Sequence, residues 1–452
     1  MENSSRFFKN SECSFFPCHQ NFEGGTENFN CFFCFCPLYG KTPCPGNPTY
    51  IKKDDGRIIK RCTDCTFPHK PENYDKIMSL LKTSAQKNDV FSEYHHGGEV
   101  NQKLRPEILD MSVNTNPLGL PESVKKTLQS SLELLERYPD QNCTLLKEKL
   151  ADAKAIPPEN LIFGNGASEL ISLFVQAVSP KSALIVSPTF SGYERALKIC
   201  YSKIHHHLLS EESDFTLDDT IFNSIDKTSP DMLFLCSPNN PTGKMVDFDL
   251  LKKLVSVCEE KGIFLFVDEC FIEFTGLEKD SCVSLIEENQ HLIVLNAFTK
   301  IYAMAGIRLG YACTSNQGLL AKVNFLRPEW NVSSLAQIAG LSALEEGEYL
   351  QKTRALIKQE REYLSKELKA LGFKVYPGEA NFILFDSKGS LCQENPASPR
   401  QSIGEFLLNK GILLRNCANF TGLSENFWRV AVRNHDENEK LISLLKDSVI
   451  FP

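Results

Sequence analysis

The sequence predicts an α/β protein with a doubly wound, mostly parallel sheet, a smaller C-terminal α+β domain and an N-terminal cysteine-rich module. Three observations predict this. Buried-strand and helix patterns alternate from about residue 95, helical patterns precede strand patterns after about residue 335, and eight of the 17 cysteines lie in the first 65 residues. We expect a module at 1–82, a linker at 83–94, an N-terminal arm with the large domain at 95–335, and the small domain at 336–452.

The N-terminal segment contains closely spaced cysteines in "CFFCFC" and "CTDC". CxxC pairs at this spacing are typical of tetrahedral metal sites. A segment of about 80 residues with few aliphatic side chains also needs a stabilising element such as a bound metal. With His19 and His69 nearby, there are enough ligands for one or two zinc sites, and an iron–sulfur cluster is the alternative. The segment resembles small cysteine-rich domains, regarded as metal-binding, that occur alone or fused to corrinoid-pathway enzymes. The candidate metal ligands are Cys13, Cys18, Cys31, Cys34, Cys36, Cys44, Cys62 and Cys65.

After the polar linker "KTSAQKNDVFSEY", apolar runs predict the strands of the large domain. These runs are "NLIFGNG", "SALIVSP", "DMLFLCSP", "GIFLFVDE" and "HLIVLNAF", and helical patterns such as "ASELISLFVQAV" lie between them. A sheet of this kind places its sites at the carboxyl ends of the strands. The small domain follows as the amphipathic "EYLQKTRALIKQEREYLSKELKALG" and the strands "ANFILF", "GILLRN" and "FWRVAVR".

Charged and small residues follow several of these strands. The turn "FGNGASELI" puts Ala167 and Ser168 at a helix N-terminus, which suits a phosphate, although a tight turn alone explains it equally well. Asp268 directly follows a buried strand and needs a partner, such as a protonated ring nitrogen. Lys300 suits Schiff-base chemistry, and Arg308 has the fork geometry for a phosphate. Each charge alone fits an ordinary paired side chain; together, at strand ends of one sheet, they predict a cofactor site.

The order of Gly-rich turn, Asn-Pro-Thr-Gly, Asp, Lys and Arg over about residues 95–440 resembles fold-type I pyridoxal 5'-phosphate (PLP) enzymes, the aspartate aminotransferase-like superfamily with the class I/II aminotransferase fold. The resemblance implies that Lys300 binds PLP as a Schiff base, Asp268 pairs with the pyridinium nitrogen, Asn240 bonds the ring hydroxyl and Tyr193 stacks on the ring. Residues implied to hold the cofactor phosphate are Ala167, Ser168, Thr299 and Arg308. Tyr138 in "ERYPD" resembles a tyrosine that reaches the neighbouring subunit's cofactor, which implies a homodimer.

Within this superfamily, "HHGGEV", "SVNTNPLG", "YPGEANFILF" and "GILLRNCANFTGL" resemble threonine-phosphate decarboxylases. The resemblance implies a lyase that decarboxylates L-threonine 3-O-phosphate or L-serine O-phosphate. The product would be aminopropanol phosphate or ethanolamine phosphate for the nucleotide loop of cobamides such as cobalamin. A histidinol-phosphate-type aminotransferase is the alternative, since nearly the same residues serve both reactions. Substrate residues implied by the motifs are Arg429 for the carboxylate, and Arg415, His96, Gly97 and Asn114 at or beside the phosphate.

Two residues depart from the usual pattern of the superfamily. Phe271 stands where most aminotransferases of this fold have a tyrosine that donates to the ring oxygen, as in the decarboxylase branch. Losing that donor is expected to raise the pKa of the Schiff base, because the deprotonated form loses a hydrogen bond. Ala297 stands where many relatives have serine, so phosphate binding is expected to depend more on the backbone and Ser168.

Composition excludes several other classes. A net charge of −8 gives no reason to expect nucleic acid or an anionic membrane surface as a partner. The sequence has no apolar run of about 18 residues, and its first residues lack the apolar core of a secretory signal. The nine cysteines after residue 65 lie mostly in apolar runs and are expected in the core. We therefore expect a cytoplasmic enzyme.

Overall fold

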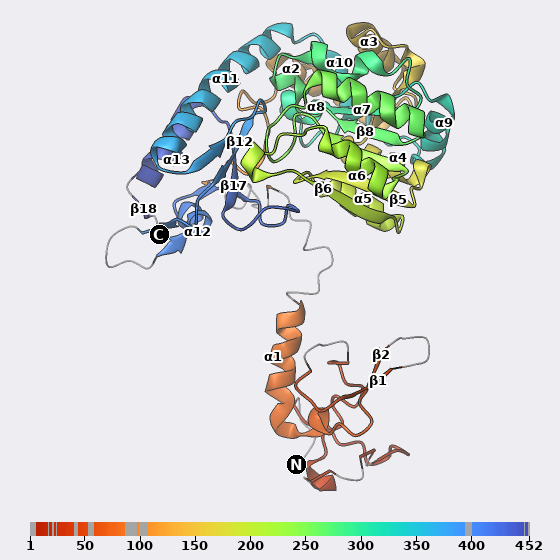
Figure 1. Cartoon of the computed structure of the whole chain (residues 1–452), viewed down its shortest axis with the longest axis vertical. Helices are drawn as coiled ribbons and strands as arrows, with labels where there is room; N and C mark the ends of the chain where they lie inside the picture. Colours follow the sequence, from red (N-terminus) through yellow and green to blue (C-terminus); the bar gives the residue numbers. More distant parts are fainter. Residues whose placement is uncertain are drawn as a thin grey trace. The chain divides into compact units, whose positions relative to one another are not determined.

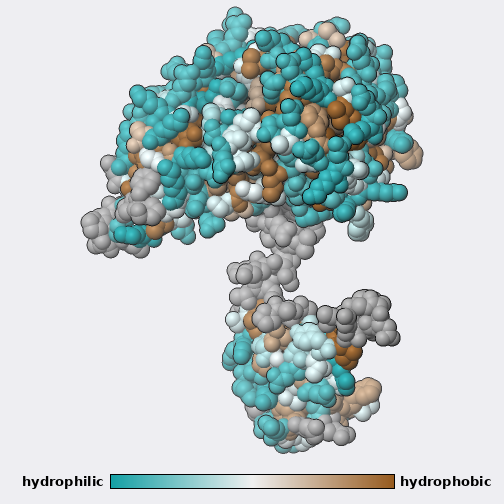
Figure 2. All heavy atoms as spheres, in the orientation of Figure 1, coloured by the Kyte–Doolittle hydropathy of each residue, from teal (hydrophilic) through white to brown (hydrophobic). Residues whose placement is uncertain are grey.

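The computed structural model describes residues 6–16, 18–19, 22–23, 25–39, 44–52, 58–85, 97–98, 107–393, 400–446 and 448–450. The chain divides into two compact units, Met1–Glu93 and Tyr94–Pro452 (Figure 1). Among the described residues, no helix combines the length and the apolar character needed to cross a membrane. Figure 2 shows hydrophilic side chains over most of the visible face of the larger unit, with hydrophobic residues in separate patches.

The smaller unit contains little regular structure. Its elements are the 3₁₀ turns Thr26–Asn28, Phe67–His69 and Pro71–Asn73, the antiparallel strands β1 (Thr49–Lys52) and β2 (Ile58–Arg61), and α1 (Tyr74–Ala85). The principal apolar cluster among its described residues consists of buried Phe33, Leu38 and Ile77. Helix α1 runs three residues past the predicted module boundary at residue 82, into the predicted linker. So small a core favours an additional stabilising element in this unit.

A seven-stranded sheet forms the centre of the larger unit, in the order β4-β10-β9-β8-β7-β5-β6. The strand pairs from β9 to β6 are parallel, whereas β10 is antiparallel to both of its neighbours, β4 and β9. The predicted doubly wound, mostly parallel sheet is therefore confirmed. The strand β10 was not predicted, because its four residues do not form an extended apolar run. The strands are β4 (Leu161–Gly164), β5 (Ser182–Ser187), β6 (Lys203–Leu208), β7 (Met232–Cys236), β8 (Phe264–Asp268), β9 (Leu292–Ala297) and β10 (Gly310–Cys313).

Helices cover this sheet and bury its apolar residues in one large core (Figure 1). They are α2 (Glu122–Ser130), α3 (Thr144–Lys154), α4 (Ala167–Val178), α5 (Gly192–Ile199), α6 (Thr220–Thr228), α7 (Phe248–Lys261), α8 (Phe298–Ile301), α9 (Gln317–Leu326) and α10 (Ser334–Ala343). The predicted domain boundary after residue 335 falls inside α10, which packs against α2 and α3. The large domain therefore continues to the end of α10.

The small domain begins with the long helix α11 (Gly347–Ala370) and contains the antiparallel sheet β11-β12-β17-β16. Its strands are β11 (Lys374–Tyr376), β12 (Phe382–Asp386), β16 (Arg415–Asn416) and β17 (Phe427–Ala431), and its other helices are α12 (Ile403–Asn409) and α13 (His435–Lys446). A second small sheet joins β13 (Leu391–Cys392), β14 (Gln401–Ser402) and β18 (Val449–Ile450). The early strand β3 (Leu109–Asp110) pairs in parallel with β15 (Ile412–Leu413), which ties the segment before the large domain to the small domain.

Candidate active site

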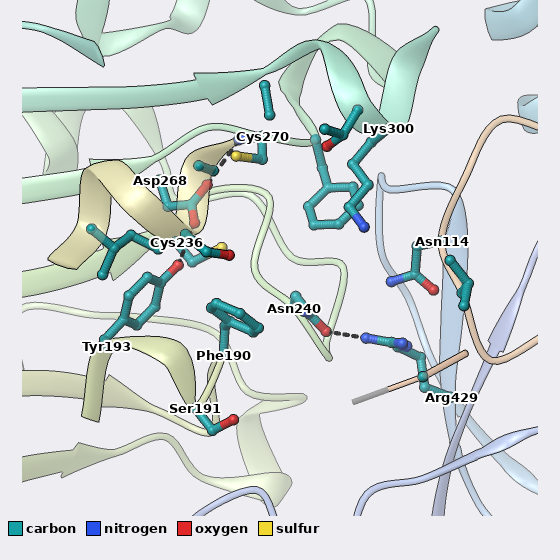
Figure 3. A pocket seen from close by; sticks show the side chains of 18 of the residues that line it. Asn114, Phe190, Ser191, Tyr193, Cys236, Asn240, Asp268, Cys270, Lys300 and Arg429 are labelled. Carbon is teal, nitrogen blue, oxygen red and sulfur yellow. Dashed lines mark hydrogen bonds between the residues drawn. The ribbon is translucent and has the colours of Figure 1, made fainter. Parts of the chain in front are cut away.

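A cavity of about 320 Å³ lies at the carboxyl edge of the central sheet, and strands of the small domain line it as well (Figure 3). The last residues of β7, β8 and β9 all contribute to its wall, because parallel strands end at one edge of a sheet. Predicted site residues that line this cavity are Gly97, Asn114, Ala167, Ser168, Tyr193, Asn240, Asp268, Thr299, Lys300, Arg308, Arg415 and Arg429. Of the predicted site residues in the larger unit, His96 lies outside the described residues, and Tyr138 lies elsewhere on the surface.

Lys300 lies in the one-turn helix α8, which directly follows β9. Burial lowers the pKa of its amine to about 8, and the positive charges of Arg429 and Arg308 act in the same direction. An amine with this pKa is neutral in an appreciable fraction of molecules near neutral pH. Lys300 therefore has the protonation behaviour that a nucleophilic amine needs.

Asp268 is the last residue of β8 and is only 6% exposed. Its Oδ2 accepts a hydrogen bond from the Tyr193 hydroxyl at 2.6 Å, and its Oδ1 accepts one from the Cys270 backbone N–H at 3.0 Å. These two donors orient the carboxylate but are neutral. A buried carboxylate of this kind is best compensated by a positively charged group in the cavity.

The expected stacking role of Tyr193 stays a prediction, and the structure offers a second aromatic ring for that role. The Tyr193 side chain is fully buried, its ring stacks on Phe234 at 5.0 Å, and its hydroxyl donates to Asp268. Phe190, which the sequence reasoning missed, lines the cavity and meets Tyr193 edge to face (Figure 3). Phe190 lies in the loop after β5, whereas Tyr193 is already in the first turn of α5. The two rings of "PTFSGYERA" therefore approach the cavity from different elements, a loop and a helix.

The N-terminus of α4 and Arg308 form a cradle for an anion. Gly166 caps α4 with φ 81°, and a Cβ placed on it would lie 2.4 Å from Arg308 Nη2. A Cβ on Gly310 would lie 2.7 Å from the Ala167 nitrogen. The guanidinium thus lies against the helix N-terminus, where peptide N–H groups lack intrahelical partners. Such a combination of cation and helix N-terminus suits a phosphate, as the sequence predicted.

Arg429 lies in β17, is 5% exposed, and forms no ion pair with any carboxylate that the structure describes. Its Nη1 donates to Asn240 Oδ1 and its Nη2 to the Ser112 carbonyl at 2.7 Å, while the buried Nε has no partner. Burial lowers the pKa of this guanidinium to about 10. The group is therefore a buried cation that no described carboxylate pairs with directly, and Figure 3 shows it facing the same space as Lys300.

Arg415 borders the same end of the cavity and pairs in register with Arg429 across β16 and β17. Its Nη1 donates to the Asn416 carbonyl and its Nη2 to Asn419 Oδ1, both at 2.7 Å, and its guanidinium lies over Phe420 at 5.4 Å. These contacts hold the guanidinium in place at the rim. Two oriented cations side by side suit a ligand with two anionic groups.

Gly97 and Asn114 lie beside these arginines. A Cβ on Gly97 would lie 2.2 Å from the Ser112 carbonyl oxygen, so only glycine fits this close approach. The buried Asn114 Oδ1 has no hydrogen-bond partner, while the Asn114 carbonyl accepts from Asn381 at 3.1 Å. An unpartnered buried polar atom at the cavity is a natural contact for a ligand.

Two thiols that the sequence analysis assigned to the core also line the cavity. Cys236 ends β7 opposite Asp268, and its Sγ donates to the Pro238 carbonyl at 3.2 Å. Cys270 follows Asp268 by two residues. Burial raises the pKa of both thiols. They therefore stay protonated and contribute neutral, polarisable surface beside the carboxylate.

Tyr138 lies outside this cavity. It is 78% exposed and stacks on Trp330 with ring centroids 4.4 Å apart. Its expected contact with the cofactor of a neighbouring subunit stays a prediction.

In the smaller unit, one group of candidate ligands lies within 4.8 Å among the described residues: Cys18, His19 and His69. A cavity of about 180 Å³ is lined by His19 and His69 and by five of the predicted ligands, Cys34, Cys36, Cys44, Cys62 and Cys65. Cys13 and Cys31 do not line it. His19 and His69, which the sequence analysis counted as further possible ligands beside the eight cysteines, are thus the two histidines that the fold brings to a thiol.

Residues 106–445 match the aminotransferase class I and II family, and residues 4–91 match the cysteine-rich small domain family. Threonine-phosphate decarboxylase of Salmonella typhimurium is 35% identical over 78% of this chain and 96% of that protein. The adenosylcobalamin biosynthesis bifunctional protein CobDQ of Leptospira interrogans is 37% identical over 77% of this chain and 40% of its own length. The crystal structure of histidinol-phosphate aminotransferase from Clostridium acetobutylicum has a TM-score of 0.68 and 31% identity, covering 75% of this chain and 98% of that one.

Proposed function

The chain belongs to the aminotransferase class I and II family, and from this premise we propose that it is a PLP-dependent decarboxylase of an O-phosphorylated hydroxy amino acid. The observation that carries the proposal is the pair Arg415 and Arg429, since a substrate of this class has both a carboxylate and a phosphate. The substrates proposed are L-threonine 3-O-phosphate and L-serine O-phosphate. Their products, aminopropanol phosphate and ethanolamine phosphate, would serve cobamide synthesis, which the similarity to CobDQ supports.

The residues around the cavity fit PLP. The cradle of Arg308 and the α4 N-terminus suits its phosphate, buried Asp268 suits its protonated ring nitrogen, and Lys300 suits covalent attachment. Phe190 is proposed to cover the ring, and Asn240 to contact the ring hydroxyl. Once bound, PLP supplies a conjugated system that accepts the electron pair of a broken Cα bond.

The protein residues decide which Cα bond breaks. Arg429 is proposed to bind the substrate carboxylate and hold its bond to Cα in the orientation in which carbon dioxide leaves. Arg415, Gly97 and Asn114 are proposed to hold the substrate phosphate at the other end of the molecule, together with His96. Lys300, with its amine free in the substrate complex, would be the group that returns a proton to Cα.

A histidinol-phosphate-type aminotransferase is the second candidate, because the similar Clostridium acetobutylicum structure has that activity and the same cavity residues serve either reaction. The test is to incubate the PLP-loaded protein with phosphothreonine and phosphoserine and to measure carbon dioxide. Release of carbon dioxide in proportion to protein is expected. Keto-acid-dependent amino transfer from histidinol phosphate, without carbon dioxide from either phosphoamino acid, would contradict the proposal.

We also propose a homodimer, in which Tyr138 reaches the partner's cofactor. The exposure of Tyr138 and its position outside the cavity of its own chain support this.

All 17 cysteines are unpaired thiols, which supports the expected cytoplasmic location. The cysteine-rich unit is proposed to bind zinc. Its match to the cysteine-rich small domain family and its small apolar core support this.

A further inference from the structure

His69 of the smaller unit has the environment of a metal-binding histidine. Its side chain is buried, with the residue 2% exposed, and its ring stacks on Phe29 at 4.3 Å. Its Nδ1 lies 3.0 Å from the carbonyl oxygen of Asn30. Because a carbonyl oxygen only accepts, Nδ1 carries the proton, and Nε2 keeps the lone pair that binds a metal. A histidine that ligates a metal through one nitrogen typically donates from the other in this way.

The carbonyl that orients His69 is itself fixed. Asn30 is buried, and its side-chain Oδ1 accepts from the backbone N–H groups of Phe8 at 3.1 Å and Phe32 at 3.0 Å. Its Nδ2 donates to the Arg6 carbonyl at 3.0 Å, and its own N–H donates to the His69 carbonyl at 2.9 Å. Contacts within the protein therefore hold the imidazole of His69 in one orientation.

Three further candidate ligands lie beside His69. The ligand atoms of Cys18, His19 and His69 lie within 4.8 Å of one another, and the thiols of Cys18 and Cys34 hydrogen-bond to each other. Tetrahedral zinc with bonds of about 2.3 Å to sulfur and about 2.0 Å to nitrogen holds neighbouring ligand atoms about 3.3–3.8 Å apart. Closing the observed group by about 1 Å would satisfy this geometry.

We propose that Cys18, His19, Cys34 and His69 form a tetrahedral zinc site with two sulfur and two nitrogen ligands. A second, all-sulfur site consists of Cys36, Cys44, Cys62 and Cys65. The inference rests on the proposal that this unit binds zinc, and it assigns the ligands. It does not depend on the reaction at the PLP cavity.

The second set differs from the first in its chemistry, although His19, Cys34 and His69 of the first set line the same cavity. Its four thiols border one cavity, and the backbone N–H of Asn47 donates to Cys65 Sγ at 3.4 Å. A Cβ on Gly46 would lie 2.7 Å from the same sulfur, so the loop after Cys44 passes directly against Cys65. Peptide N–H groups directed at sulfur favour the thiolate form that binds zinc. Cys13 and Cys31 are left outside both sites.

The test uses the full chain purified with its native metal. Elemental analysis is expected to give about two zinc ions per chain. X-ray absorption at the zinc edge is expected to give an average of about three sulfur and one nitrogen per zinc, the mean of the two sites. Two zinc ions with sulfur ligands only would overturn the histidine assignment while leaving zinc binding intact. A chain that binds no zinc, or that shows an iron–sulfur cluster instead, would overturn the zinc proposal as well.

Variants separate the two sites. His19→Gln, at a partly exposed position, is expected to remove one zinc ion and the nitrogen signal together, and His69→Gln repeats the test at a second ligand. Cys62→Ser is expected to remove the other zinc ion and leave the nitrogen signal. His205→Gln, on strand β6 of the larger unit, is the matched control and is expected to keep both ions. Retention of both zinc ions and of the nitrogen signal in His19→Gln and in His69→Gln would overturn the proposal.

Discussion

Arg415 and Arg429 lie directly opposite each other on the antiparallel strands β16 and β17, and both line the same cavity. Like charges placed opposite each other in a sheet are destabilising unless an anion lies between them. Burial, and secondarily the charge of Arg415, lowers the pKa of Arg429 to about 10. A ligand with a carboxylate and a phosphate would neutralise both cations, which ties this pair to the proposed substrate class.

Arg415→Ala is expected to separate recognition of the phosphate from the rest of the reaction. Losing a charge-assisted contact to a phosphate costs about 2–3 kcal/mol, or about 30–160-fold in kcat/KM. The loss should appear with phosphothreonine and not with unphosphorylated threonine. Steady-state kinetics with both substrates measure it. Equal losses with the two substrates would place Arg415 outside phosphate recognition.

Covalent capture of PLP by the cofactor-free protein is expected to depend on pH through Lys300. The pKa of this amine is lowered from 10.5 to about 8, so the neutral form is half populated near pH 8 and predominates above it. Below that pH the neutral fraction falls about tenfold per unit, and the rate of capture should fall with it. Stopped-flow absorbance at a series of pH values measures the midpoint.

The arginines provide the control for this pH dependence. Arg429→Gln is expected to raise the midpoint, because removal of a nearby positive charge makes the Lys300 ammonium less unfavourable. Arg415→Gln is expected to leave the midpoint in place, since its charge is not among the causes of the Lys300 shift. A midpoint near the ordinary lysine value in the wild-type protein would contradict the prediction.

Phe190→Ala is expected to weaken PLP binding, because the Phe190 ring borders the cavity while the fully buried Tyr193 ring already stacks on Phe234. Loss of an aromatic contact of this kind costs about 0.5–1.5 kcal/mol beyond its buried area, which corresponds to about a 2–10-fold rise in the dissociation constant. Tyr193→Phe keeps the buried ring and removes only the hydroxyl that donates to Asp268, so it should lower kcat more than PLP affinity. Fluorescence titration with PLP compares the PLP affinity of the two variants. A larger loss of affinity in Tyr193→Phe than in Phe190→Ala would favour Tyr193 as the stacking residue.

The sequence was informative where the function depends on residues at the ends of predicted strands. Asp268 and Lys300 follow apolar runs that form β8 and β9, so their meeting at one sheet edge could be predicted. The position of Phe190 at the cavity could not be predicted, because it depends on the residue at which α5 begins. The register that pairs Arg415 with Arg429 across a ten-residue connection has no local signal either.

The same reasoning applies in the smaller unit. CxxC spacing drew attention to the cysteines, whereas the approach of His69 to Cys18 and His19 depends on contacts between segments about 50 residues apart. Such contacts are set by tertiary packing around Phe29 and Asn30. A pattern within one segment does not encode them.

Phe271→Tyr is expected to lower the pKa of the Lys300–PLP linkage. Phe271 lines the cavity and packs edge to face on Phe382 with ring centroids 5.1 Å apart. A hydroxyl added at this position would be expected to donate to the ring oxygen of bound PLP and so to stabilise the deprotonated linkage. The absorption spectrum of the PLP-loaded variant, titrated against pH beside the wild type, measures the shift. An unchanged or higher pKa in the variant would show that Phe271 does not face the ring oxygen.

Gly166→Ala tests the phosphate cradle. Gly166 has φ 81°, which alanine adopts only with strain, and its added Cβ would lie 2.4 Å from Arg308 Nη2. The guanidinium must then move away from the α4 N-terminus, so PLP affinity is expected to fall at least about tenfold while the fold persists. Gly347→Ala is the matched control, since its Cβ meets no atom within 4 Å and it begins helix α11 outside the cavity. Equilibrium dialysis with PLP and circular dichroism on both variants separate lost binding from lost folding. Unchanged PLP affinity in Gly166→Ala would mean that the phosphate binds elsewhere in the cavity and that Arg308 and the α4 N-terminus do not hold it.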